Sequence, residues 1–168
     1  MTLNELNTLT AESFIETFGS IYEHSPWVAE GVAPLRPFPT RAALISAMQE
    51  WVDRATDDQK LALIRAHPDL AGKLARAGKL TAESTREQAG LGLDRLSEDE
   101  YERFTSLNTA YRERFGFPFI ICARKHTRAS VLEAFERRLE HDEASEIGEA
   151  IRQIHDIARL RLHDAVEE

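Results

Sequence analysis

The sequence lacks most of the features that would assign a function directly. Its single cysteine, Cys122, excludes an internal disulfide, and a cysteine-based metal site is not expected. No apolar run reaches about 18 residues, so no segment is predicted to span a membrane. Walker, GxGxxG, GxSxG and HExxH motifs are all absent, and the histidines form no zinc pattern. The formal net charge of −8 argues against a generic nucleic-acid-binding protein.

Targeting signals are also absent from the two ends of the sequence. The N-terminal MTLNELNTLT lacks the charged and apolar regions of a signal peptide. The C-terminal DAVEE carries no peroxisomal address of the SKL type. We therefore expect a cytoplasmic protein.

The pattern of apolar residues predicts an all-α fold. At 168 residues, 1–168 is expected to form a single domain, a multi-helix bundle of about seven to eight helices. Helix starts are predicted near Thr10, Thr40, Thr56, Asp69, Ser84, Ser97 and Thr127, and a last helix carries Ile147, Ile151, Ile154 and Ala158 inward. Prolines between Pro26 and Pro39 are expected to prevent regular structure there. Trp51 is placed on a buried helix stripe.

One apolar run, Phe117–Cys122, does not fit a helix. The sequence has no second strand candidate, so this run is predicted to be a buried, extended connector rather than part of a sheet. Buried backbone amides without a ladder partner must bond to some other group. Cys122 is interpreted as a small core residue rather than a nucleophile.

The most unusual polar residues lie between 65 and 92. His67 ends a helix and precedes Pro68, which disfavours helical backbone at His67. A histidine there could transfer protons near neutral pH, or simply cap the last helix carbonyls. Ser84 to Glu87 fits a capping box, and the same helix start could instead bind a polar ligand. Spacing alone favours the structural alternative in both cases.

The other charged residues are less informative. Basic residues outnumber acidic ones in 65–92 and in 112–128, which would suit a small anionic ligand or merely reflect solvated faces. His24, His141 and His163 lie among charged residues and are predicted to be solvated, whereas His155 is expected to be structural.

Three separated sequence motifs resemble those of one protein family. They are HPDLAGK at 67–73, SxxEQ at 84–88 and NxxYxxRFGFPFIIC at 108–122. Along nearly its full length the sequence is similar to 2-oxo-4-hydroxy-4-carboxy-5-ureidoimidazoline (OHCU) decarboxylases, which catalyse the last step from urate to (S)-allantoin. The resemblance implies a homodimeric carboxy-lyase that needs no cofactor and no metal, and acts on a small anionic ureidoimidazoline.

The resemblance also implies site residues. His67 matches the catalytic acid/base, and Glu87 is expected to assist it. Matched substrate contacts are Pro68, Ser84, Thr85, Arg86, Glu87, Gln88, Phe119, Ile120, Ile121, Cys122 and Ala123. Arg159 and Arg161 could bind the substrate carboxylate or form helix-face salt bridges. A rival interpretation is a non-catalytic helical module that binds the ligand, or a partner, without turnover.

Overall fold

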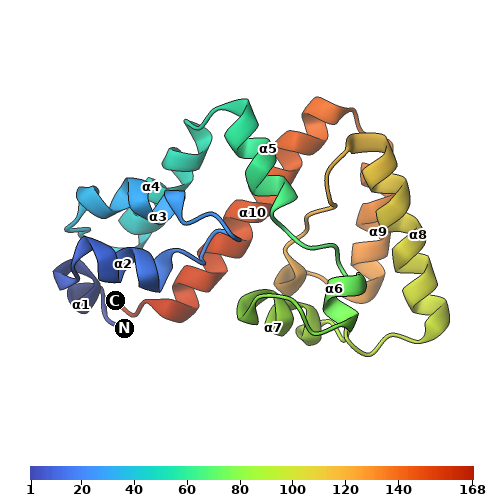
Figure 1. The fold of residues 1–168 in the computed structure, drawn as a ribbon, viewed down its shortest axis with the longest axis horizontal. Coiled ribbons are helices and arrows are strands. Elements are labelled where there is room, and N and C mark those ends of the chain that lie inside the picture. The colour runs from blue at the N-terminus through green and yellow to red at the C-terminus, as the bar shows by residue number, and fades with distance from the viewer. The chain divides into compact units, whose positions relative to one another are not determined.

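The computed structural model confirms the all-α fold (Figure 1). It describes the backbone of residues 1–168 and every side chain except those of Lys73 and Leu74. Helices α1–α10 and two 3-10 helices, η1 and η2, form the regular structure. Within the described residues, the only β-type pairing is an isolated bridge between Thr2 and Glu167. No described helix is long and apolar enough to cross a membrane.

The chain divides into two compact units, which are described separately. Unit 1 comprises 1–66 and 155–168, and unit 2 comprises 67–154. The expectation that 1–168 behaves as a single domain therefore remains a prediction.

Unit 1 is built from the N-terminal helices and the end of the last one. The helices are α1 (Leu3–Thr8), α2 (Ala11–Phe18), α3 (Trp27–Val32), η1 (Ala33–Leu35), α4 (Arg41–Asp53), α5 (Asp57–Arg65) and the C-terminal part of α10 (Glu143–Ala165). Helix α3 packs on α2 and α4. Apolar side chains of α2 and α4, including Phe14, Phe18, Leu44 and Met48, are fully buried and form much of this core.

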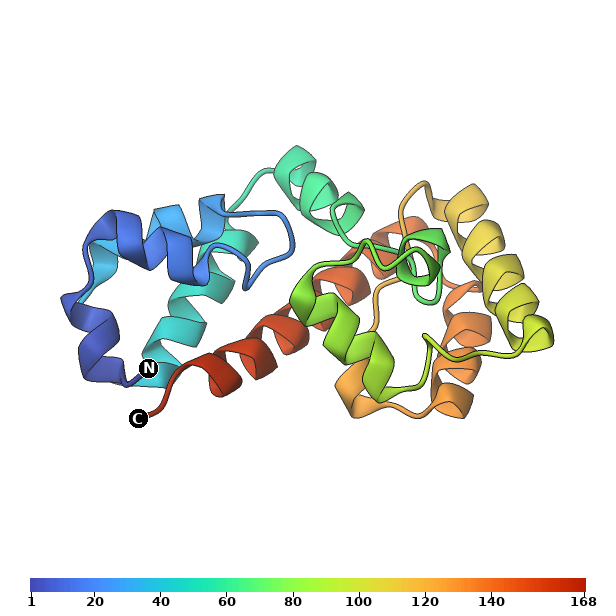
Figure 2. The same ribbon diagram turned by 60° about the horizontal axis from the view of Figure 1, so that its bottom comes forward.

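Unit 2 contains the three motifs HPDLAGK, SxxEQ and NxxYxxRFGFPFIIC. Its helices are α6 (Lys73–Arg76), α7 (Ala82–Gly90), α8 (Glu98–Phe115), η2 (Ala123–Lys125), α9 (Arg128–Arg138) and the N-terminal part of α10. Helices α8 and α9 lie side by side (Figures 1 and 2). Between them an aromatic core includes Tyr111, Phe119 and Phe135, with Phe119 stacked on Phe135 at 3.7 Å between ring centroids.

Most predicted helix starts are confirmed because their caps are readable in sequence. Thr10, Thr40, Thr56, Ser97 and Thr127 each accept a hydrogen bond from the backbone N–H three residues on. Gly116 adopts φ +76° and ends α8, where a side chain would strain the backbone.

Three predictions about unit 1 are wrong. Helix α1 was not expected, although Thr2 and Glu5 form its capping box. The proline-rich segment is partly helical, because Pro26 precedes α3 and Pro34 occupies the start of η1, where no backbone N–H is needed. Trp51 is 40% exposed, since its ring lies across Gly31 at the edge of α3 instead of entering the core.

Candidate functional site

The histidine of the first motif directly follows the end of a helix, as predicted. Helix α5 ends at Arg65, Ala66 is its C-cap, and Pro68 follows His67. The sequence did not require the His67 ring to lie in the core, but its side chain is only 7% exposed. A buried imidazole is held in a defined position, which suits a group that transfers protons.

The loop after His67 has an unusual backbone that Gln88 holds in place. Ala71 has φ +52°, in the left-handed region that non-glycine residues rarely adopt. Its N–H donates to Oε1 of Gln88 at 2.9 Å, and Nε2 of Gln88 donates to the carbonyl of Asp69 at 3.3 Å. Gln88 was predicted to contact substrate, yet both ends of its amide bond to this loop. Gln88 therefore links α7 to the loop, and its contact with substrate remains a prediction.

Helix α8 holds the same loop from another direction. Asn108 donates from Nδ2 to the Leu70 carbonyl at 2.8 Å, and Arg112 donates from Nε to the Asp69 carboxylate at 2.9 Å. The Oδ1 atom of Asn108 is buried and has no hydrogen-bond partner in the described part of the chain. Asn108 belongs to the NxxY motif, but its role in bracing the loop was not predicted.

The start of α7 corrects the predicted capping box. The helix begins at Ala82, and its N-cap is Thr81, whose Oγ1 accepts from the Ser84 N–H at 3.2 Å. Ser84 is therefore in the first turn, and Glu87 lies in the second turn rather than the first. The prediction was wrong because Ser84 and Glu87 match the box spacing, whereas Thr81 caps the helix without an acidic residue at its third position.

The face of α7 separates the predicted contacts into two groups. Ser84 and Gln88 are buried and Glu87 is half-buried, because residues three and four apart share a helix face. Thr85 and Arg86 are exposed on the other side of the helix. A contact of Thr85 or Arg86 with substrate remains a prediction, and their exposure gives it no support.

The extended run is buried, as predicted, and lies near α7. Phe119, Ile120, Ile121, Cys122 and Ala123 are all buried, and Cys122 is a core residue at 1% exposure. The run leads into η2, which packs against α7 (Figure 2). Unit 2 thus gathers all three motifs, with α7 contacting the His67 loop through Gln88 and the end of the extended run through η2.

Part of the extended backbone is already bonded within the protein. The Ile120 carbonyl accepts from Arg138, the Cys122 N–H donates to Gln153, and the Cys122 carbonyl accepts from the Lys125 N–H. These groups were expected to complete the substrate's hydrogen bonds. Because these groups already have partners within the protein, only the remaining backbone groups of the run are expected to bond to the substrate.

Several cations of the two basic segments have partners within the protein. In unit 2, Arg112 pairs with Asp69, Arg76 with Glu98 and Arg128 with Glu100, and Arg114 donates to the His141 carbonyl. Each of these cations therefore has a partner inside the protein. Charge composition alone was a weak indication of an anion site.

The remaining candidates have structural partners. His155 was expected to be structural. Its Nδ1 forms a hydrogen bond with the Tyr22 hydroxyl at 3.0 Å, and its Nε2 forms one with the Asp53 carboxylate at 2.9 Å. Burial, and secondarily Asp53, raises the pKa of Tyr22. His141 was predicted to be solvated, but its Nδ1 lies 3.0 Å from the fully buried Glu146 carboxylate.

The two C-terminal arginines lie in unit 1. Arg161 is buried and forms a 2.9 Å ion pair with Glu23, and Arg159 pairs with Asp156 at 3.2 Å. Among the described residues, no group of three or more His, Cys, Asp or Glu side chains is arranged to hold a metal ion.

These features define an all-α protein with a buried histidine on a loop that amide side chains hold in a strained conformation. The model of the OHCU decarboxylase family matches residues 7–163. The chain belongs to this family.

Individual relatives agree with the family match. The chain is 44% identical over 162 residues to 2-oxo-4-hydroxy-4-carboxy-5-ureidoimidazoline decarboxylase of Haloferax volcanii, covering 96% of this chain and 94% of the relative. It is 38% identical to the protein of that name from Mus musculus, covering 98% and 92%.

Two solved structures have the same fold. A crystal structure of (S)-allantoin synthase superposes with a TM-score of 0.81 at 34% identity, over 99% of this chain and 54% of that one. An OHCU decarboxylase crystallised in the presence of (S)-allantoin gives a TM-score of 0.66 at 22% identity, covering 93% of this chain and 97% of that chain, which is a likeness of fold.

Proposed function

We propose that this protein decarboxylates OHCU to (S)-allantoin, the last step of urate degradation, without a cofactor. Family membership over residues 7–163 supports this activity. The observation that carries the proposal is the convergence of the three family motifs in unit 2. Gln88 of SxxEQ bonds to the loop of HPDLAGK, and Asn108 of the third motif bonds to the same loop.

The substrate's own chemistry accounts for decarboxylation without an added electron sink. The carbon that bears the carboxylate and a hydroxyl lies next to a ring C=N group. When the bond to the carboxylate breaks and CO2 leaves, the electron pair moves toward that C=N nitrogen. The ring nitrogen and the carbon of the former C=N group each gain a proton, while the hydroxyl loses one and becomes the ring carbonyl, so one net proton is taken up from solvent. The protein must hold the carboxylate out of the ring plane and deliver the proton to one face.

His67 is the proposed proton-transfer group. Its burial and the braced loop behind it hold the imidazole in place, so it can take the hydroxyl proton and return a proton to the ring carbon. Glu87, half-buried on the same face of α7 as Ser84, would orient His67 or accept a ring or ureido N–H. Ser84, Pro68 and the remaining backbone groups of 119–123 would contact the amide edges of the substrate.

Gln88 has a different proposed role from the other members of this set. Because both ends of its amide bond to 69–71, Gln88 would act mainly by holding the loop next to His67. Gln88 is thus proposed as a positioning residue, whereas His67, Ser84 and Glu87 are proposed to contact the substrate.

We further propose that the enzyme is a cytoplasmic homodimer, as the family resemblance implies. Trp51 and Leu35 on unit 1 are large apolar side chains at 40% and 54% exposure, and a subunit interface could cover them. Light scattering coupled to size exclusion measures the mass directly, and a monomer of 19.0 kDa at working concentration would contradict the dimer.

The activity is tested with freshly generated OHCU, whose spontaneous decay is followed by ultraviolet absorbance. The protein should accelerate substrate loss in proportion to its concentration, with release of one CO2 per OHCU. An unchanged decay rate together with measurable ligand binding would instead support the rival, a binding module without turnover. An unchanged rate with no binding would reject both.

A further inference from the structure

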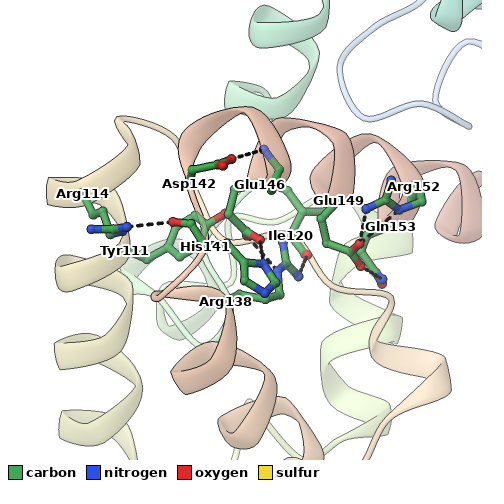
Figure 3. Close-up of polar contacts among 11 residues, drawn as sticks. Tyr111, Arg114, Ile120, Arg138, His141, Asp142, Glu146, Glu149, Arg152 and Gln153 are labelled. Carbon is green, nitrogen blue, oxygen red and sulfur yellow. Dashed lines mark hydrogen bonds and ion pairs between the residues drawn. The ribbon is translucent and has the colours of Figure 1, made fainter.

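The buried backbone of the extended run is held by two side chains that no motif includes. Arg138 donates from Nη1 to the Ile120 carbonyl at 2.6 Å. Gln153 accepts at Oε1 from the Cys122 N–H at 2.9 Å. Arg138 ends α9 and Gln153 lies in α10, so two helices hold adjacent peptide groups of one irregular segment. Figure 3 shows the bond from Arg138 to Ile120.

Arg138 is itself fixed by a buried network. Its Nε donates to Oε1 of Glu146 at 2.8 Å, and its guanidinium lies 4.3 Å from the centre of the Phe119 ring. Glu146 is fully buried and also accepts from the Tyr111 hydroxyl at 2.5 Å. Figure 3 shows Tyr111, Arg138 and His141 converging on the Glu146 carboxylate. The guanidinium therefore has little freedom to move away from the Ile120 carbonyl.

Stability does not explain why an arginine occupies this position. Removing two charges from water costs several kcal/mol per ion, and apolar residues of similar volume often serve as well or better. The Nη2 atom of Arg138 is also buried without a hydrogen-bond partner in the described part of the chain, which adds a desolvation cost. What an apolar side chain could not supply is the hydrogen bond to Ile120.

Peptide geometry shows what these two bonds determine. The C=O and N–H of one trans peptide are coplanar and point in opposite directions. Holding the Ile120 carbonyl therefore directs the Ile121 N–H away from Arg138, and holding the Cys122 N–H directs the Ile121 carbonyl away from Gln153. The orientation of one donor and one acceptor, both on Ile121, is thus set by Arg138 and Gln153.

We propose that Arg138 and Gln153 are positioning residues, which aim the Ile121 N–H and C=O at an amide edge of the substrate. This proposal rests on the proposed function. An N–H beside a C=O is the complement of the cyclic urea or ureido group of a ureidoimidazoline, which presents the same two groups in reverse. Errors in this alignment weaken substrate binding more than they affect the bond-breaking step.

Gln153 offers the cleaner substitution because it is only half-buried. Its Nε2 donates to Glu149 Oε1 at 2.9 Å, and the hydrogen bonds from Arg152 and Gln153 hold the pKa of Glu149 low despite its partial burial. Gln153→Met removes the acceptor for Cys122 while keeping the side-chain length. The swap Glu149→Gln with Gln153→Glu keeps an acceptor at 153 and a neutral donor at 149, so it is the matched conservative variant.

The experiment measures KM and kcat for OHCU, the affinity for allantoin by calorimetry, and thermal stability, on wild type and these variants. Gln153→Met should raise KM and weaken allantoin binding by about fivefold, the equivalent of one hydrogen bond, with kcat changed less. The double swap should restore both values to within about twofold of wild type. A folded Gln153→Met protein with wild-type KM and allantoin affinity would overturn the proposal, as would a swap no better than Gln153→Met.

Arg138→Lys provides a second variant that keeps the charge opposite Glu146. A lysine lacks the planar fork that reaches Glu146 and Ile120 together, so KM should rise here also. If the wild-type protein binds allantoin but leaves the rate of OHCU decay unchanged, the proposed function is rejected. In that case, weaker allantoin binding by the variants would still support the positioning role. Wild type that neither binds allantoin nor accelerates decay overturns both.

Discussion

Gln88 holds the strained backbone of Ala71, accepting its N–H at 2.9 Å while donating to the Asp69 carbonyl two residues earlier. A single amide side chain thereby satisfies two backbone groups of the loop that follows His67. A left-handed alanine persists only where its surroundings enforce it, and here the enforcing group comes from α7. The SxxEQ motif thus contributes to the geometry of the HPDLAGK motif.

Replacing Gln88 should therefore destabilise the protein. Gln88→Met leaves the buried Ala71 N–H without its acceptor, at a cost of about 1–3 kcal/mol in the free energy of unfolding. Gln88→Glu keeps an acceptor for Ala71 but places a carboxylate against the Asp69 carbonyl, so it should also be less stable than wild type. Urea unfolding measures both. Arg86 is exposed on the same helix, so Arg86→Ala should change the free energy of unfolding by less than about 0.5 kcal/mol. A loss in Arg86→Ala equal to that in Gln88→Met would contradict the role of Gln88 in holding the loop.

His67→Asn should abolish most of the catalysis while preserving the fold. General acid–base assistance contributes about 10²–10⁴-fold, so the rate of OHCU loss should fall by that factor. Asparagine retains a polar side chain of similar reach, and the melting temperature serves as the control for folding. A folded variant with an undiminished rate would show that His67 does not transfer the proton.

Tyr111→Phe tests the buried network behind the extended run. Burial, and then the hydrogen bond to Glu146, raises the pKa of Tyr111, which keeps its hydroxyl a neutral donor. Because Glu146 is fully buried, losing this donor should cost about 1.5–3 kcal/mol in unfolding experiments. Tyr101→Phe is the control, since Tyr101 contacts Arg76 through its ring, and it should leave stability nearly unchanged.

His126 should make the protein less stable in mild acid. Burial, followed by the charges of Arg137, Lys125 and Arg138, lowers the pKa of His126 below its ordinary 6.5. Below pH 6.5 the unfolded chain takes up a proton at this position more readily than the folded chain does. The free energy of unfolding therefore decreases as the pH is lowered, and it becomes constant below the pKa of the folded state. His126→Asn should lose less stability than wild type between pH 7 and pH 5. Parallel curves for the two proteins would contradict this account.

The sequence predicted the elements whose signals are local. Thr56 with Gln59 and Ser97 with Glu100 mark helix starts because each cap bonds only three residues away. The same rule failed at Ser84, where two caps compete within four residues and the sequence pattern favours the one that the fold does not use. Helix α3 was missed because prolines at helix starts look like breakers until their position in the helix is known.

The site could be predicted only in part, for a physical reason. His67, Ser84 and Gln88 were found through motif resemblance, and the structure places them in one unit. The bonds from Asn108 to Leu70 and from Arg138 to Ile120 join residues 38 and 18 positions apart, and neither spacing has a local signature. Nothing in the sequence marks Arg138 and Glu146 as a buried ion pair, because burial of such a pair is decided by tertiary packing.

The handedness of the allantoin produced is the most direct test of proton delivery by His67 to one face of the substrate. Spontaneous decay of OHCU in water should give allantoin without optical activity, whereas proton delivery to one face in a chiral pocket gives one enantiomer. Circular dichroism of the allantoin formed with and without the protein distinguishes the two. We expect a signal of the (S) enantiomer that requires the protein and is lost in His67→Asn. Racemic allantoin formed at the uncatalysed rate in the presence of the folded protein would contradict it.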